Sequence, residues 1–105
     1  MHEEKKIITY LMVISGRKQK EDLLKFLTEM GANIVNVSYG EGSVKSNSPL
    51  IEVFGFVPEE GKVIITCLLL RDKANDVIDR LEKVFEFNKA NTGIAFTARV
   101  DSLSF

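Results

Sequence analysis

The chain has 105 residues, of which 45% are apolar and 28% are charged, and this balance is typical of a globular protein with a hydrophobic core. A chain of this length fits one domain, so we expect a single domain over residues 1–105. Lys and Arg total 14 against 15 Asp and Glu, and the net charge of -1 argues against partners that need a global basic surplus, such as nucleic acid or an anionic membrane surface.

The first residues, MHEEKK, are charged and lack the apolar core of a signal peptide. No stretch has the run of apolar residues that a membrane-spanning helix requires, so membrane insertion is not expected. The single cysteine, Cys67, argues against an internal disulfide framework and against a cysteine-based zinc cluster. These features lead us to expect a cytoplasmic protein.

The first predicted elements are a strand and a helix. Lys5–Ile14 is apolar and β-branched after its two lysines and shows little alternation, which is typical of a strand buried on both faces. Ser15 or Gly16 can then cap a helix that runs from about Lys18 to Met30, with leucines repeating on one face. Gly31 follows where a helix-terminating glycine is expected.

Two more strands flank a long loop. Ala32–Gly40 is β-branched and ends at a glycine, so it is predicted to be the second strand. Gly40–Gly61 is mostly polar and rich in Gly and Ser, although Leu50–Phe56 within it fits either a helical turn or a short strand. Lys62–Leu70, KVIITCLLL, is too β-branched for a helix and too short for a membrane span, so it is predicted to be a central strand buried on both faces. Its Cys67 is expected to be an inert buried thiol.

A second helix and a last strand complete the chain. Asp72 is a plausible N-cap, and Val77, Ile78, Leu81, Val84 and Phe85 share one apolar face. The helix is expected to end over Asn88–Gly93, and Ile94–Val100 alternates as a strand does.

The order strand, helix, strand, strand, helix, strand predicts an α+β fold of the ferredoxin-like βαββαβ type. In this fold a four-stranded antiparallel sheet carries both helices on one face. The first and third strands are apolar on both sides, so the face without helices needs another cover. We therefore expect the chain to form a homo-oligomer.

Three segments resemble the PII-type nitrogen regulatory signalling proteins, and the likeness is closest to the shorter, divergent PII-like members. These segments are VSYGEGSVK at the end of the second strand, GKVIITCLLL at the third strand, and TGIAFTARV at the last. The resemblance implies a homotrimer that binds an adenine nucleotide such as ATP, ADP or AMP, or a related effector, between its subunits. It also implies signal transduction to a partner protein, an enzyme or a transporter, through a T-loop after the second strand.

The resemblance extends to individual ligand-binding positions. Gly40 and Gly42 align with the glycine pair at the base of the T-loop, and Lys62 matches the lysine that opens the third strand. Thr92 and Gly93 match part of the family's second phosphate-cradling loop. That loop is shorter here, since TG runs directly into IAF, and the closing DSLSF contains none of the family's C-terminal arginines.

The residue chemistry agrees with these positions but leaves alternatives open. Glycines at Gly40 and Gly42 allow backbone N–H groups to approach an anion, or they serve a turn that needs positive φ. Lys62 either supplies a charge to an anion or is a solvated lysine at a strand end. The loop residues expected to contact a partner protein are Glu41, Ser43, Val44, Lys45 and Phe54.

Two other classes of function remain as alternatives. One is a trimeric protein-interaction module without a small-molecule ligand, and the other is a small ferredoxin-like enzyme. The sequence contains no Ser/His/Asp set, no HExxH motif, no Walker A loop and no Cys/His metal spacing. We therefore expect no catalytic residue, no metal and no covalent cofactor, and we favour a regulator over an enzyme.

Overall fold

A computed structural model of the chain describes residues 7–41, 61–89 and 92–104. The strands are β1 (Ile8–Gly16), β2 (Asn33–Glu41), β3 (Gly61–Leu70) and β4 (Gly93–Arg99). A short 3-10 helix, η1 (Arg17–Gln19), leads into α1 (Lys20–Glu29), and α3 (Arg71–Lys83) follows β3 directly. Within the described part of the chain, no helix is long and apolar enough to cross a membrane.

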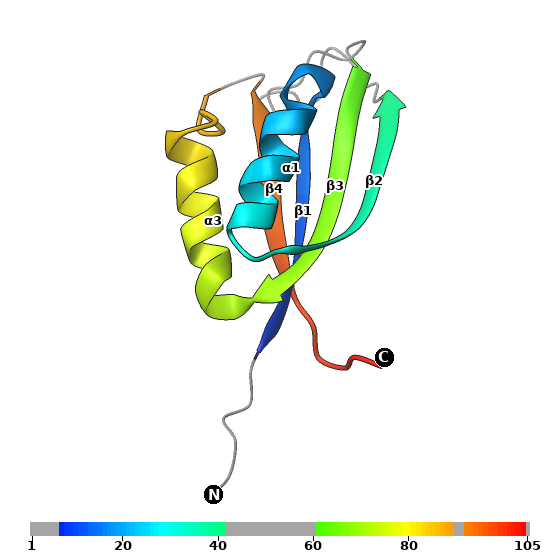
Figure 1. The fold of residues 1–105 in the computed structure, drawn as a ribbon, viewed down its shortest axis with the longest axis vertical. Helices are drawn as coiled ribbons and strands as arrows, with labels where there is room; N and C mark the ends of the chain where they lie inside the picture. The colour runs from blue at the N-terminus through cyan, green and yellow to red at the C-terminus, as the bar shows by residue number, and fades with distance from the viewer. Residues whose placement is uncertain (1–6, 42–60, 90–91, 105) are drawn as a thin grey trace, which may run out of the picture.

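The four strands form one antiparallel sheet in the order β2-β3-β1-β4. β3 lies between β1 and β2, and β1 lies between β3 and β4, which is the split βαβ arrangement that the order of elements predicts. Both helices cover the same face of this sheet (Figure 1). The predicted ferredoxin-like α+β fold is confirmed.

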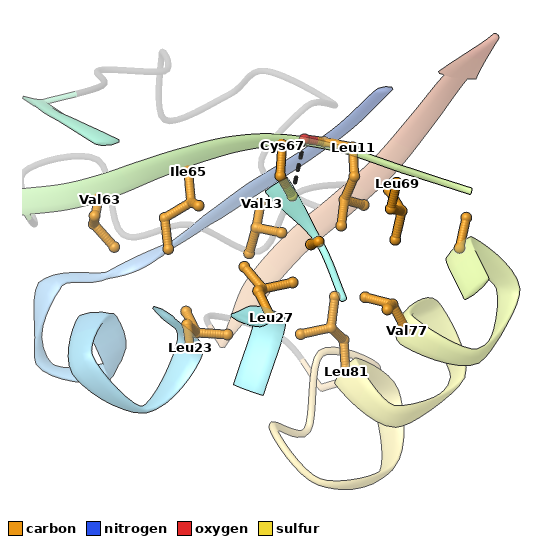
Figure 2. Close-up of a cluster of buried hydrophobic side chains, with 12 residues drawn as sticks. Leu11, Val13, Leu23, Leu27, Val63, Ile65, Cys67, Leu69, Val77 and Leu81 are labelled. Atoms are coloured by element: carbon orange, nitrogen blue, oxygen red, sulfur yellow. Dashed lines mark hydrogen bonds between the residues drawn. The ribbon is translucent and has the colours of Figure 1, made fainter. Parts of the chain in front are cut away.

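The core lies between that face of the sheet and the two helices (Figure 2). Side chains alternate along a strand, and in β1 the residues facing the helices, such as Leu11 and Val13, are fully buried. In α3 the buried residues Ala74, Val77 and Leu81 recur at the spacing of one helix face. Figure 2 shows the labelled leucines of α1 and α3 pointing toward the same strands, so one apolar cluster joins the two helices to the sheet.

The prediction that β1 and β3 are buried on both faces is wrong in part for the single chain. The residues of β3 that face the helices, Val63, Ile65 and Cys67, are fully buried. On the other face of β3, Lys62 and Thr66 are buried as well, whereas Ile64 and Leu68 are partly exposed. The helices of one chain cover only one face, so the apolar side chains of the second face remain partly exposed.

The ends of the helices differ from the sequence prediction. Neither Ser15 nor Gly16 caps α1: its N-cap is Gln19 and makes no side-chain capping bond. Asp72, the predicted N-cap of the second helix, lies in the first turn of α3, because the helix begins at Arg71 directly after β3 and its N-cap is Leu70. Gly31 has φ +85°, so its predicted role at the end of α1 is confirmed.

Candidate functional site

The register of the sheet brings several predicted site residues to one end, which we call the loop end. Lys62 lies directly opposite Gly40 on one neighbouring strand and Gly16 on the other. Gly93 lies opposite Ser15, which is also opposite Val63 on β3. Since neighbouring strands are about 4.8 Å apart, Gly93 lies about 10 Å from β3 across β1. Predicted residues from β2, β3 and β4 therefore share this end.

Lys62 is only 6% exposed, so the alternative of a solvated lysine is wrong. It alternates with the core residue Val63 and therefore lies on the face of the sheet away from the helices. Its neighbours across both flanking ladders, Gly16 and Gly40, have no side chains. The side chain of Lys62 is therefore enclosed by groups other than side chains of its two partners in the sheet.

Gly40 lies within β2 and has ordinary extended backbone geometry. The described residues with positive φ are Gly31 and Glu86, so the alternative that Gly40 serves a turn with positive φ is wrong. A Cβ atom added to Gly40 would meet Ile64 Cδ1 at 3.8 Å, which is an ordinary contact. The fold therefore tolerates a small side chain there, and a bare backbone at this position is available for close approach by a ligand.

Position 93 requires a glycine for a structural reason that does not apply to Gly40. A Cβ atom added to Gly93 would lie 2.5 Å from Phe87 Cζ, too close for the fold to accept without movement. The preceding residue, Thr92, accepts a hydrogen bond from the Ser15 hydroxyl through its carbonyl oxygen at 3.3 Å. Of the predicted ligand-binding residues, Thr92 is thus tethered to β1 and Gly93 is packed against an aromatic ring.

The loop end also contains a basic cluster that the sequence reasoning missed. Arg17 Cζ and Lys20 Nζ lie 5.2 and 5.4 Å from the centroid of the half-exposed Tyr39 ring. A hydrogen bond with Tyr39 is the main cause that raises the pKa of Lys20, and Glu21, 3.6 Å away, adds to it. The run RKQK directly after β1 was a signal for this cluster, but only the fold brings Tyr39 beside it.

The absence of a side chain at Gly61 allows the Arg17 side chain to pack against the start of β3. A Cβ atom added to Gly61 would lie 3.1 Å from Arg17 Nε, so the guanidinium group packs against the bare start of β3. With Lys18 and Lys20 from the same turn and Lys62 from β3, four cations gather at the loop end of a chain whose net charge is -1. Such a local excess of positive charge favours an anionic ligand.

Several predicted residues cannot be placed. Gly42 and the predicted partner contacts Ser43, Val44, Lys45 and Phe54 lie outside the described residues, as does Leu50–Phe56. Glu41 is the last residue of β2 and lies opposite Gly61. The two ends of the connection from β2 to β3 are therefore adjacent, as a loop that leaves from and returns to one end of the sheet requires.

Cys67 is fully buried, as predicted, and burial raises its pKa to about 11. Its thiol lies 3.9 Å from the carbonyl oxygen of Leu11, drawn as a dashed line in Figure 2. A thiol held protonated in the core is a weak nucleophile. Among the residues with described placement, no three His, Cys, Asp or Glu side chains gather into a possible metal site. The chemistry that the loop end offers is anion binding.

No family model and no curated protein sequence matches the chain. Solved structures do match its fold. CPII, a nitrogen regulatory PII-like protein of Thiomonas intermedia solved with ADP, AMP and acetate, has a TM-score of 0.62 at 15% identity, and the match covers 90% of this chain and 87% of that one. The GlnK–ATP complex of B. subtilis has a TM-score of 0.59 at 13% identity, over 90% and 85% of the two chains.

The same fold also occurs inside a longer protein. A Bacillus cereus protein related to NIF3 has a TM-score of 0.66 at 14% identity, and the match covers 97% of this chain but 28% of that one. At such low identities, structural likeness establishes a shared fold. The resemblance to PII-type proteins that the sequence predicts is confirmed at this level: the chain has the fold of the PII-like signalling proteins.

Proposed function

We propose that this chain is a divergent PII-like regulator: a cytoplasmic, homotrimeric sensor that binds a small anionic effector between its subunits. The observation that carries the proposal is the side-by-side placement of Gly40 and Lys62 at the loop end of a PII-like fold. An adenine nucleotide is the favoured effector, because CPII was solved with ADP and AMP and GlnK with ATP.

The chemistry of the loop end supports an anionic effector. Gly40 offers a backbone that a phosphate can approach closely, and Lys62 supplies a charge one strand away. Arg17 and Lys20 add positive charge on the helix side of the same end. Thr92 and Gly93, together with Gly42, complete the proposed ligand-binding set.

The uncovered sheet face supports the homotrimer. The partly exposed residues on that face are apolar over three strands: Tyr10, Met12, Ile14, Ile64, Leu68, Ile94 and Phe96. The β2 strand contributes the polar residues Asn36 and Ser38 to the same face, so the apolar area stops at one edge of the sheet. We assign this area to contacts with two further copies of the chain, which would bury it as a core does.

Signalling would use the Gly40–Gly61 loop, which would contact an enzyme or transporter through Glu41, Ser43, Val44, Lys45 and Phe54. An effector bound at Gly40 and Lys62 touches the strand residues adjacent to both ends of that loop. Binding of the effector would favour one conformation of the loop, and the partner protein would bind that conformation selectively.

One observation favours a second candidate, a trimeric interaction module without a small-molecule ligand. Phe87 explains the glycine at position 93 by packing alone, so this residue does not require a phosphate. An enzyme is disfavoured, because the groups with a shifted pKa among the described residues are the buried thiol of Cys67 and the amine of Lys20 near the surface. No pair of side chains suited to acid–base catalysis accompanies them.

Calorimetry of the wild-type chain with ATP, ADP, AMP and cyclic nucleotides tests the proposal. We expect saturable binding of at least one adenine nucleotide with roughly micromolar affinity, since ordering a loop reduces the net binding energy. Mass spectrometry of small molecules retained through purification should identify the same class of ligand. A trimer that binds no nucleotide and retains no small molecule would favour the interaction module, and turnover of any of these nucleotides would favour an enzyme.

A further inference from the structure

A polar cleft lies at the end of the sheet opposite the loop end. It has a volume of about 230 Å³ and opens between the first turn of α3 and the adjoining ends of β1 and β4. Its polar lining consists of Thr9, Arg71, Asn75, Thr97 and Arg99. Thr9 and Ser15 are six residues apart on β1, so the cleft lies about 20 Å from the loop end. It is therefore a separate place on the molecule.

The fold brings these five side chains together from three elements. Arg99 lies opposite Thr9, and Thr97 lies opposite the core residue Leu11, so alternation places all three on the face that the helices cover. Arg71 and Asn75 are four residues apart on α3 and therefore lie on one side of that helix. Two arginines thus line one cleft from opposite elements, although their positions are 28 residues apart in the chain.

Thr9 presents a hydroxyl to the floor of the cleft. The residue as a whole is 6% exposed and lines the cleft. No buried side-chain oxygen or nitrogen of the described residues lacks a hydrogen-bond partner, so the Thr9 hydroxyl is open to the cleft rather than sealed in the core. A ligand that enters the cleft can therefore exchange hydrogen bonds with it.

The arginines are also available to a ligand. Within the described ranges Arg71 forms no ion pair, so the local pair with Asp72 that its position in sequence suggests is not made. Arg99 contacts Asp101 through its Nε atom at 3.3 Å, and both side chains are largely exposed, which makes the pair weak. The remaining guanidinium N–H groups of Arg99 stay available as donors.

We propose that this cleft binds a phosphate group, either free or carried by a small phosphorylated molecule. Two guanidinium groups, two hydroxyls and one amide surround the space, and guanidinium groups match the geometry of phosphate oxygens in pairs. The cleft also adjoins the N-terminal turn of α3, whose dipole favours negative charge. Two carboxylates lie beside the set: Asp101, which is paired with Arg99, and Asp72 in the first turn of α3.

NMR titration of the full-length, ¹⁵N-labelled protein with inorganic phosphate tests this site, with chloride at matched ionic strength as the reference. We expect saturable shifts centred on the amides of Thr9, Asn75 and Arg99 and on the arginine side-chain N–H groups. Parallel titrations with glycerol phosphate separate the two sources: tight binding of the ester supports a phosphorylated metabolite, and binding of phosphate alone supports the free ion. Equal shifts with phosphate and chloride, or shifts centred on Gly40 and Lys62, would overturn the proposal.

Matched variants make the test specific. Arg71→Gln and Arg99→Gln each remove one charged donor and should weaken phosphate binding by about tenfold or more. Thr9→Val keeps the side-chain shape and the charge but removes the hydroxyl, and should also weaken binding. The control is Arg80→Gln, which removes an exposed arginine two turns further along α3 and should leave the affinity unchanged. If Arg80→Gln weakens binding as much as the cleft variants do, the effect is general electrostatics and the site is wrong.

Discussion

The ring of Phe87 occupies the space that a side chain at Gly93 would need. A Cβ atom added to Gly93 would meet three atoms of this ring at 2.5 to 2.8 Å. The backbone of Phe87 is held by its amide, which donates to the Leu81 carbonyl at 3.1 Å, and the ring packs edge-on against Phe85 with the centroids 6.4 Å apart. This contact packs the first residue of β4 against the segment that follows α3, so the position of Gly93 at the loop end depends on aromatic packing.

The first prediction follows from this contact. Gly93→Ala should lower the free energy of unfolding by about 1–3 kcal/mol, because the ring must leave its packed position. Urea denaturation measures the change, and Gly40→Ala is the control, since its added Cβ meets only Ile64 at 3.8 Å. In a Phe87→Ala background the cost of Gly93→Ala should shrink. If the cost is the same in both backgrounds, the ring is not the cause.

The second prediction concerns the loop end. Lys62→Ala should weaken nucleotide binding by roughly ten- to a hundredfold, or about 1.5–3 kcal/mol, because it removes one charge-assisted contact. Calorimetry measures the affinity. Lys25→Ala is the matched control, since it removes an exposed lysine from the middle of α1. Wild-type affinity in the Lys62 variant would show that the nucleotide binds elsewhere.

Gly40→Val extends this test without changing charge. The strand tolerates a β-branched residue, and the fold leaves room for a Cβ atom at this position. We expect a loss of affinity similar to that of Lys62→Ala, with little change in unfolding, because the added methyl groups block close approach of a phosphate to the backbone. Unchanged binding would mean that the ligand does not approach β2 at this residue.

The third prediction concerns assembly. Light scattering on a sizing column should report about three times the 11.8 kDa chain mass. Phe96 lies opposite Met12 on the uncovered face and is 45% exposed, so Phe96→Lys should dissociate the trimer by placing a charge in an apolar interface. Val84→Lys is the control, because Val84 is 66% exposed at the end of α3. A wild-type chain that stays monomeric at micromolar concentration would contradict the proposed assembly.

The fourth prediction uses the thiol of Cys67. Burial raises its pKa from 9.0 to about 11, so the folded state keeps the thiol proton over a pH range where the unfolded chain loses it. The stability that this difference contributes is complete below pH 9 and is lost as the pH rises toward about 11. Unfolding experiments should show a steeper loss for the wild type than for Cys67→Val across this range.

The native thiol should also react slowly with a thiol reagent at neutral pH, because it is protonated and fully buried. Unfolding the chain in urea should restore the rate expected of a free cysteine. Rapid labelling of the native protein, or identical pH profiles for the wild type and Cys67→Val, would contradict the burial of this side chain.

The sequence by itself determined the order of the elements and the face of each helix that is buried. Hydrophobic periodicity encodes both, because it depends only on neighbours along the chain. The apolar stripe of α3 and the terminating role of Gly31 were readable in this way, whereas the alternating burial of β1 was not, because both of its faces are apolar. The cap of α1 could not be predicted in this way. The Ser15 hydroxyl, a predicted cap, instead donates a hydrogen bond to the carbonyl oxygen of Thr92, which is 77 residues away in the chain.

Only the tertiary structure decided which residues meet across the sheet. Register depends on how the strands pack together, so no local pattern shows that Lys62 lies between Gly40 and Gly16, or that Phe87 fills the space at Gly93. The cation–π contact of Arg17 with Tyr39 and the cleft that joins Thr9, Arg71 and Arg99 arise in the same way. Residues far apart in a chain become neighbours only through packing, and sites built from them are therefore set by the fold rather than by any one segment.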